Sequence, residues 1–412
     1  MISTFWRIAV QLSRRLYVRV LMIALLSVLS LLVAKLMGPL IPEGLADVIG
    51  AKAVDPILQT LSSSMLAVSI FSLTIMTGAF RTASSQWSPR THVILKDDTT
   101  THSVLASFVG AYLFALMAIV LRSTHFFGEK EIVVLFGFTI GVIVLIVANL
   151  ILWIAHLEEL GSLDKTGNQV QRRAEAAMRE IAKRPCYGAQ SLNDPETAGS
   201  GGRKPVRATR AGYVQQIFQD RLQDSAEAEE VRIYVVARIG AYLQAGEVLA
   251  YVEGDADAVA KAVRMAVVID SSRSFQQDPG FGVLVLTEIA SRALSPGIND
   301  PQTAIDMVNR LATVLAQADP PDECEAPRLD RVWMVPPDLD GFFRMSFDRI
   351  ARDAGGMVEV HQAIAEALQA LARTAGPTLA ELASAGAARC ALRAEMELDG
   401  DPDLARYRSE KD

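Results

Sequence analysis

The sequence has little cysteine and lacks the motifs that most often mark a catalytic or metal site. Its three cysteines, Cys186, Cys324 and Cys390, are far apart, and no CxxC pair or cysteine–histidine cluster occurs. This spacing predicts reduced thiols and argues against a structural zinc site. A nucleophile elbow, a phosphate loop and an HExxH motif are also missing, and the five histidines are scattered. We therefore expect neither an enzyme nor a bound cofactor or metal.

Charge is absent from three long apolar runs near the N-terminus, at residues 56–80, 103–121 and 132–155. An uncharged apolar stretch of about 18 residues or more can cross the hydrocarbon core of a bilayer, which is about 30 Å thick. No run of comparable length follows in the remainder of the chain. The sequence thus predicts a membrane protein with a large soluble part, and the lipid bilayer as its first partner.

A fourth span is expected at about residues 16–37. Its strictly uncharged part, residues 20–34, is short, but Arg19 and Lys35 at its two ends can reach the headgroups. A retained helix is favoured over a cleaved signal peptide because no small-x-small cleavage site follows the run.

The positions of the basic residues predict how the spans are oriented. Lys and Arg are more frequent before the first span, between the second and third, and after the fourth than in the other two loops. Because cytoplasmic loops carry the excess of basic residues, both termini are expected in the cytoplasm, with the chain in the inner membrane.

The two parts of the chain differ in charge. Residues 1–156 carry 11 Lys and Arg against 7 Asp and Glu, whereas residues 157–412 carry 29 against 40. Phosphate binding needs clustered positive charge, so the acidic soluble part argues against a nucleic-acid partner.

The residue pattern of the soluble part predicts an α+β domain. A juxtamembrane helix and linker are expected over residues 157–204, either as a solvated helix or as a neck that joins copies of an oligomer. A small β-barrel-like or β-sheet portion is expected over 205–254, a helical α/β portion over 255–398 and a frayed charged tail over 399–412. In the helical portion the predicted N-caps are Asp255 and Asp257 for the first helix, Asp278 for the second and Asp300 for the third, and residues 342–347 suggest a short strand.

Two motifs resemble a known bacterial family. The first is Gln86-Trp87-Ser88-Pro89-Arg90, after the second span. The second runs from Arg273 through Gln277-Asp278-Pro-Gly to Ser295-Pro296-Gly297-Ile298-Asn299-Asp300-Pro301. With these motifs the chain resembles the membrane-protein family labelled domain of unknown function 2254, although Trp87 and Ser274 stand where Phe and Thr are common. The resemblance implies four spans and a cytoplasmic C-terminal domain, but no activity.

The run from Ser295 to Pro301 is expected to form a turn between two helices. One interpretation is a rigid corner, with Glu288 and Arg292 paired on the preceding helix. The other is a contact with a ligand or a second subunit, in which Arg292 and Asn299 would bind an anion next to a helix N-terminus.

The second span is rich in hydroxyl groups. Of these, Ser62, Ser69, Ser72 and Thr77 fall on similar sides of a helical wheel and are candidates for lining a pore. Bonds from hydroxyls to their own helix are the alternative. The leading functional hypothesis is a homo-oligomeric, channel-like or transport-related protein for a small ion. The rival is a membrane-anchored sensor or scaffold that binds a cytoplasmic ligand or protein.

Overall fold

The computed structural model describes residues 16–37, 54–90, 98–124, 126–159, 162–321, 325–399 and 402–409. The chain divides into two compact units, Met1–Thr166, which we call the membrane unit, and Gly167–Asp412, which we call the α+β unit. Each is described by itself.

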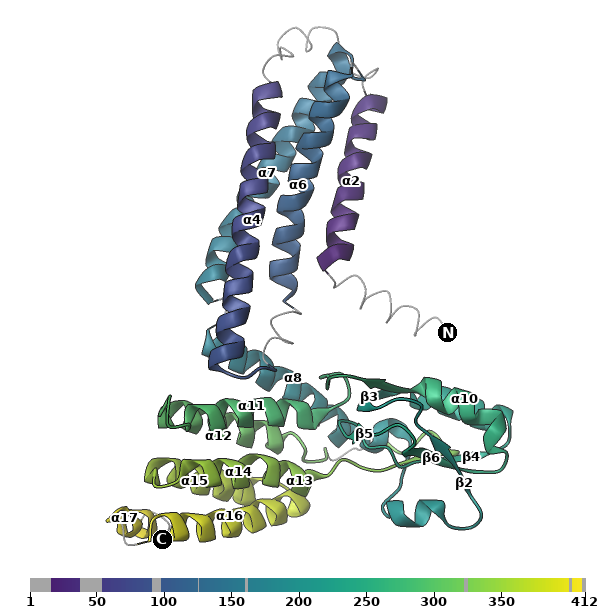
Figure 1. Ribbon diagram of the computed structural model, residues 1–412, viewed down its shortest axis with the longest axis vertical. Coiled ribbons are helices and arrows are strands. Elements are labelled where there is room, and N and C mark those ends of the chain that lie inside the picture. The colour runs from purple at the N-terminus through teal and green to yellow at the C-terminus, as the bar shows by residue number, and fades with distance from the viewer. Residues whose placement is uncertain are drawn as a thin grey trace. The chain divides into compact units, whose positions relative to one another are not determined.

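The membrane unit contains four long helices that lie alongside one another (Figure 1). They are α2 (Leu16–Met37), α4 (Val54–Gln86), α6 (Thr99–Ser123) and α7 (Glu129–Glu159). All four are long and apolar enough to cross a membrane, so an apolar helix is present at each of the four predicted spans. Each of the last three extends past its uncharged run, because polar residues at both ends continue the same helix.

Helix α6 is the centre of this unit and packs against the other three helices. Its approach to α2 is closest at Gly110, where an added Cβ would lie 2.1 Å from Cγ2 of Ile23. The Ser27 hydroxyl of α2 donates to the Gly110 carbonyl at 3.2 Å. Small residues at such crossings let apolar helices pack closely without a hydrophobic driving force.

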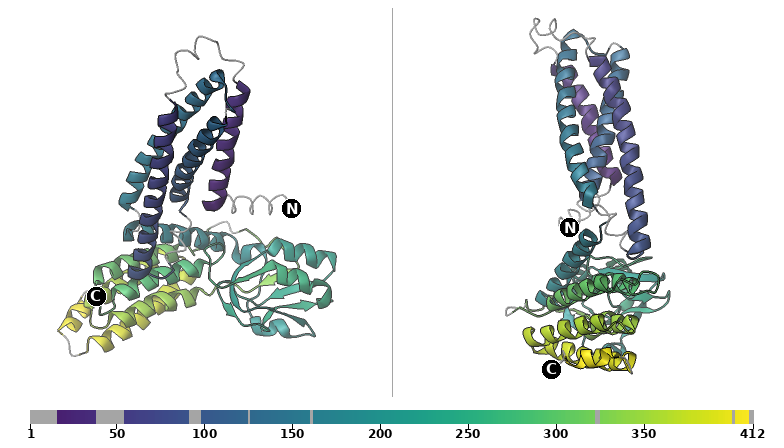
Figure 2. Two further views of the ribbon diagram at one scale, coloured as in Figure 1. Left: turned by 45° about the horizontal axis from the view of Figure 1, so that its top comes forward. Right: turned by 90° about the vertical axis from the view of Figure 1, so that its left-hand side faces the viewer.

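In the α+β unit the helices are stacked in layers at one end (Figure 2). The successive layers are α11 (Pro279–Ala293) and α12 (Pro301–Ala316), then α14 (Arg349–Ala354) and α15 (Val358–Thr374), then α16 (Pro377–Glu397) and α17 (Asp403–Ser409). Between the strands and these layers lies the short helix α13 (Leu339–Phe343), followed by a π-helical turn, Arg344–Asp348.

The strands form two sheets at the other end. The larger has the order β1 (Gln190–Ser191), β8 (Val332–Met334), β4 (Arg232–Val235), β6 (Val248–Glu253) and β2 (Lys204–Arg207). The smaller has the order β5 (Tyr242–Leu243), β3 (Gly212–Ile217) and β7 (Val267–Asp270). Helices α9 (Gln219–Ala228) and α10 (Ala256–Ala266) share a buried core with both sheets. The barrel-like alternative is not formed among the described residues, because both sheets are open and their end strands do not pair with each other.

The predicted helix starts are confirmed. Asp255 accepts from Asp257 N at 3.0 Å, Asp278 from Phe281 N at 3.1 Å and Asp300 from Thr303 N at 3.0 Å.

Two local predictions are wrong. Residues 342–347 are helical, because Phe343 and Phe347 stand one turn apart and are both fully buried. The tail contains α17, which is held by the buried ring of Tyr407.

The predicted juxtamembrane segment does contain a helix, but this helix is not solvated on all sides, and a role as a neck that joins copies of an oligomer stays a prediction. Helix α7 ends at Glu159, and a separate helix, α8 (Leu163–Lys183), follows. Helix α8 buries Val170, Ala174 and Met178. Ala174 lies so close to α11 that a Cβ on Gly282 would be 2.3 Å from its Cβ. The apolar face of α8 is therefore used within the chain.

Candidate functional site

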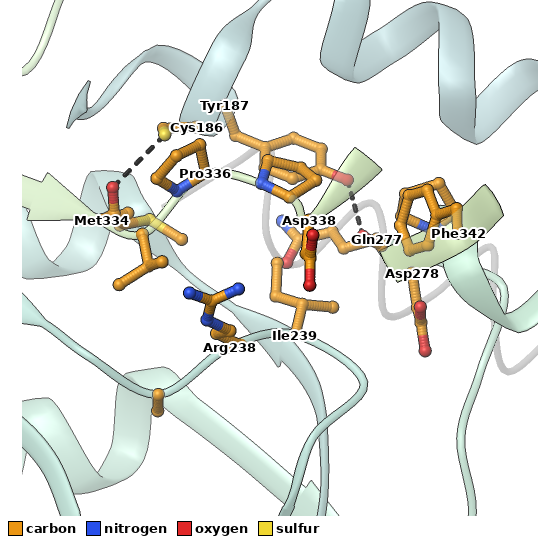
Figure 3. Close-up of a pocket in the computed structure, with 14 residues that line it drawn as sticks. Cys186, Tyr187, Arg238, Ile239, Gln277, Asp278, Met334, Pro336, Asp338 and Phe342 are labelled. Carbon is orange, nitrogen blue, oxygen red and sulfur yellow. Dashed lines mark hydrogen bonds between the residues drawn. The ribbon is translucent and has the colours of Figure 1, made fainter. Parts of the chain in front are cut away.

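A cavity of about 110 Å³ lies in the α+β unit, between the strands and the layered helices (Figure 3). Four segments that are distant in sequence line it. They are Cys186 and Tyr187 after α8; Ala237, Arg238 and Ile239 after β4; Gln277, Asp278 and Pro279 at the start of α11; and Met334–Asp338 with Phe342 after β8. The lining is mostly apolar, with a few polar groups, as is usual for small-molecule sites.

One wall of the cavity contains the buried Asp278, which forms an ion pair with Arg273. Arg273 binds Asp278 in bidentate fashion, with Nε 2.6 Å from Oδ2 and Nη2 2.7 Å from Oδ1. The Asp278 side chain is only 3% exposed and also accepts the Phe281 backbone N–H. Because its oxygens are already occupied, Asp278 fixes the start of α11 and is poorly placed to act as a free acid or base.

Gln277 ties three segments together beside this pair. Its side-chain oxygen accepts from Ile217 N at 2.8 Å and its amide donates to Ile217 O at 3.1 Å, so it caps the end of β3 as a neighbouring strand would. Its own carbonyl accepts a 2.6 Å hydrogen bond from the Tyr187 hydroxyl.

The part of the lining formed by Cys186 and Tyr187 has an unusual backbone. Cys186 and Tyr187 both adopt left-handed φ values, 53° and 56°. Non-glycine residues in this region cost roughly 1–2 kcal/mol each, and such strain clusters at functional sites. The Cys186 thiol donates to Met334 O at 3.3 Å, and burial raises the pKa of this thiol to about 11. Burial, followed by the charge of Asp278, likewise raises the pKa of Tyr187, so its phenol stays a neutral donor.

Two exposed charged side chains, Arg238 and Asp338, complete the cavity (Figure 3). Asp338 caps α13 by accepting from Gly341 N at 2.9 Å through Oδ1. Pro336, Pro337 and Phe342 form the apolar surface near them. The arrangement can hold a small molecule with an apolar body and a charged end.

Of the residues singled out in the sequence, Gln277 and Asp278 lie in this cavity. The motif from Gln86 to Arg90 belongs to the membrane unit, where α4 ends at Gln86. There the buried Ser88 hydroxyl accepts from Arg90 N at 3.1 Å, the Trp87 Nε1 atom is buried, and Pro89 is exposed in the turn. The motif therefore forms a local turn in the other unit.

The Ser295–Pro301 run forms the expected interhelical corner. The Ser295 carbonyl accepts from both Ile298 N and Asn299 N at 2.9 Å, and Asn299 has a left-handed φ of 54°. Asp300 also accepts the Thr303 hydroxyl at 2.6 Å. Arg292, Pro296 and Gly297 are exposed, while Glu288 and Pro301 are half-buried. A contact between this corner and a ligand or subunit stays a prediction.

The hydroxyls of α4 are placed differently from one another. Ser69 is buried and donates to Met65 O at 2.7 Å, whereas Thr77 is exposed and donates to Thr74 O at 2.9 Å. Ser62 is half-buried. Ser72 is fully buried, and its hydroxyl has no partner among the residues that the structure describes. A pore-lining role for these four residues stays a prediction.

The membrane unit also contains a polar cluster that was not predicted from the sequence. His156 Nε2 lies 2.6 Å from Asp98 Oδ2, and Lys165 Nζ lies 3.2 Å from His156 Nδ1. Since an ammonium can only donate, Nδ1 accepts and Nε2 carries the proton given to Asp98. Burial alone would raise the pKa of Asp98, but hydrogen bonds from His156 and Thr101 bring it down to about 2. In the sequence Asp98 stands directly before the third span, but no pattern near either residue predicts its pairing with His156.

The model of the family described as predicted membrane protein (DUF2254) matches residues 13–370. Uncharacterized proteins of Mycobacterium bovis and of two Mycobacterium tuberculosis strains, CDC 1551 and H37Rv, are each 26% identical to it over 334 residues, or 77% of this chain. The chain spans 63% of the length of each of these curated relatives. No solved structure matches the chain.

Proposed function

The chain belongs to the DUF2254 family of predicted membrane proteins, and on that premise we propose that it is a membrane-anchored protein whose α+β unit binds a small ligand in the cavity beside Tyr187. The observation that carries the proposal is the strained pair Cys186 and Tyr187, held against the cavity by hydrogen bonds to Met334 and Gln277. Strain of this kind persists only where the surrounding structure determines it, and it is typical of binding sites.

Contacts within the protein hold the walls of the cavity in place, which favours binding. Three features fix the walls before any ligand binds. They are the bidentate bond of Arg273 to Asp278, the pairing of Gln277 with Ile217 and the sequence Pro336-Pro337. A preformed site loses little conformational entropy on binding. In this proposal the pocket binds its ligand without converting it.

The membrane unit acts as the anchor in this proposal. The distribution of Lys and Arg supports an orientation with both termini in the cytoplasm and the four helices in the inner membrane. The α+β unit would then report or use a ligand on the cytoplasmic side.

Binding of small fragments to the full chain in mild detergent, followed by ligand-observed NMR, tests this function. Ile239→Trp would fill the cavity and abolish binding of the fragments that occupy it. Ile298→Trp, at the exposed interhelical corner, adds the same bulk outside the cavity and serves as the control. Fragment binding that is identical in both variants would contradict the proposal.

A channel-like function in a homo-oligomer is the second candidate, and one observation favours it. The Ser72 hydroxyl is buried in α4 with no partner among the described residues. Leaving such a group unsatisfied costs about 1–3 kcal/mol, and transient water or a small ion could satisfy it. Reconstituted protein should then give an ion flux that Ser72→Ala changes. Absence of flux under tension, voltage and varied pH, or a monomer in mild detergent, would exclude this candidate.

A further inference from the structure

The cavity offers one positive and one negative side chain that are not paired with each other. Arg238 lies in the link after β4, and Asp338 in the link after β8. Figure 3 shows both at the cavity, with the Ile239 side chain beside them. Among the described residues neither side chain takes part in a salt bridge. Both charges are therefore available to a ligand.

The other polar groups of the lining are already in use. Asp278 is held by Arg273 and by the Phe281 N–H, the Tyr187 hydroxyl donates to Gln277 O, and the Cys186 thiol donates to Met334 O. Recognition of a charged ligand thus falls to the Arg238 guanidinium and to the Asp338 oxygen that does not cap α13.

The space near these charges is small and apolar. Ile239, Pro336, Pro337 and Phe342 line it, and its volume is about 110 Å³. An engineered protein cavity of about 150 Å³ holds one benzene molecule, so this one suits an apolar group of three or four carbons.

We propose that the pocket binds a small zwitterion of the α-amino-acid class with a short branched apolar side chain, an inference that rests on the proposed ligand-binding function. A guanidinium binds a carboxylate with two parallel hydrogen bonds, and the Asp338 carboxylate accepts from an ammonium. A plain anion would leave Asp338 next to a like charge, and a plain amine would leave Arg238 without a partner. A zwitterion satisfies both.

Three matched probes test the ligand class on the full chain in detergent by isothermal titration calorimetry. They are valine, isovalerate, which lacks the ammonium group, and isobutylamine, which lacks the carboxylate. We expect saturable binding of valine, and binding of isovalerate and of isobutylamine that is weaker by about tenfold or more.

Arg238→Gln and Asp338→Asn should each weaken valine binding by about tenfold. Arg352→Gln removes an exposed arginine outside the pocket and should leave binding unchanged.

The outcomes separate this inference from the function on which it rests. If isovalerate binds as tightly as valine and Asp338→Asn does not change valine binding, the ligand is a plain carboxylate, and the inference of a zwitterion is wrong. Failure of all three probes while Ile239→Trp still abolishes fragment binding would overturn the amino-acid class but keep the pocket. Fragment binding insensitive to Ile239→Trp would overturn the pocket itself. The unfolding temperature of each ligand-free variant shows whether a loss of binding comes from loss of folding.

Discussion

Gly240 lies directly against Asp278. A Cβ on Gly240 would come within 2.6 Å of Asp278 Oδ2 and 2.7 Å of Arg273 Nη2. Gly240 also has a left-handed φ of 82° and donates its N–H to Val214 O at 2.8 Å. The turn after β4 therefore packs against the ion pair of Arg273 and Asp278 at the N-terminus of α11. This contact connects the strands to the helices at the cavity.

Gly240→Ala should destabilise the α+β unit, because it adds backbone strain and pushes apart a buried ion pair. We expect a loss of about 2 kcal/mol or more in the free energy of unfolding, measured by denaturant unfolding of the full chain. Gly246→Ala is the matched control, since Gly246 also has a left-handed φ, 92°, but open space around its Cβ position. Its expected loss is about 1 kcal/mol, from strain alone. Equal losses in the two variants would contradict a specific role for the Asp278 contact.

Gly282→Ala should loosen the crossing of α8 and α11. The new methyl would lie 2.3 Å from the Ala174 Cβ, so the helices must move apart, at a cost of about 1–3 kcal/mol. Ala174→Gly in the same chain should restore most of the lost stability. Gly297→Ala, where nothing lies within 4 Å, should be nearly silent. The thermal unfolding temperatures of the single and double variants measure the coupling, and additive losses would show that this crossing is not tight.

Gly110→Ala should separate α2 from α6 in the membrane unit. The added Cβ would meet Cγ2 of Ile23, a branched side chain that cannot rotate away freely. We expect a lower unfolding temperature in detergent and rescue by Ile23→Ala. Gly137→Ala on α7 meets no atom within 4 Å and serves as the control. Equal effects at Gly110 and Gly137 would argue against the described packing of α2.

Stability should fall in mild acid because of His361. Its ring is 2% exposed, Nε2 donates to Gly355 O at 2.8 Å, and Nδ1 is buried without a partner among the described residues. Burial lowers its pKa below the ordinary value of 6.5, although Glu397 and Glu359 act in the opposite direction. Below pH 6.5 the unfolded chain therefore binds more protons at this histidine than the folded chain does, so the free energy of unfolding decreases as the pH falls. Well above pH 6.5 His361 is neutral in both states and makes no contribution to the pH dependence.

Thermal unfolding of the full chain between pH 7.5 and pH 5 measures this dependence. His361→Gln can keep a hydrogen bond to Gly355 O but cannot take up a proton, so its profile should be flatter. Because His361 lies against Tyr407 of α17, with ring centroids 6.4 Å apart, acid should also expose the C-terminal helix to carboxypeptidase. A profile unchanged by the substitution would assign the pH dependence to other groups.

Much of the architecture was determined by local sequence. The absence of charge from residues 56–80, 103–121 and 132–155 was sufficient to predict spans, because transfer into lipid depends on the hydropathy of one segment at a time. Asp278 and Asp300 marked helix starts for a similar reason, since a capping side chain bonds to backbone only three residues ahead. The family resemblance rested on motifs of the same short range.

Only the tertiary structure decided the cavity and the buried clusters. Tyr187 and Gln277 are 90 residues apart, and no local pattern in either segment indicates their hydrogen bond. The pairing of Asp98 with His156 likewise joins two helices that meet through packing. Hydropathy and capping act within a few residues, whereas a pocket depends on which faces of distant elements are buried together. The sequence by itself therefore determined the four apolar helices, and the packing of the α+β unit decided where the candidate cavity lies.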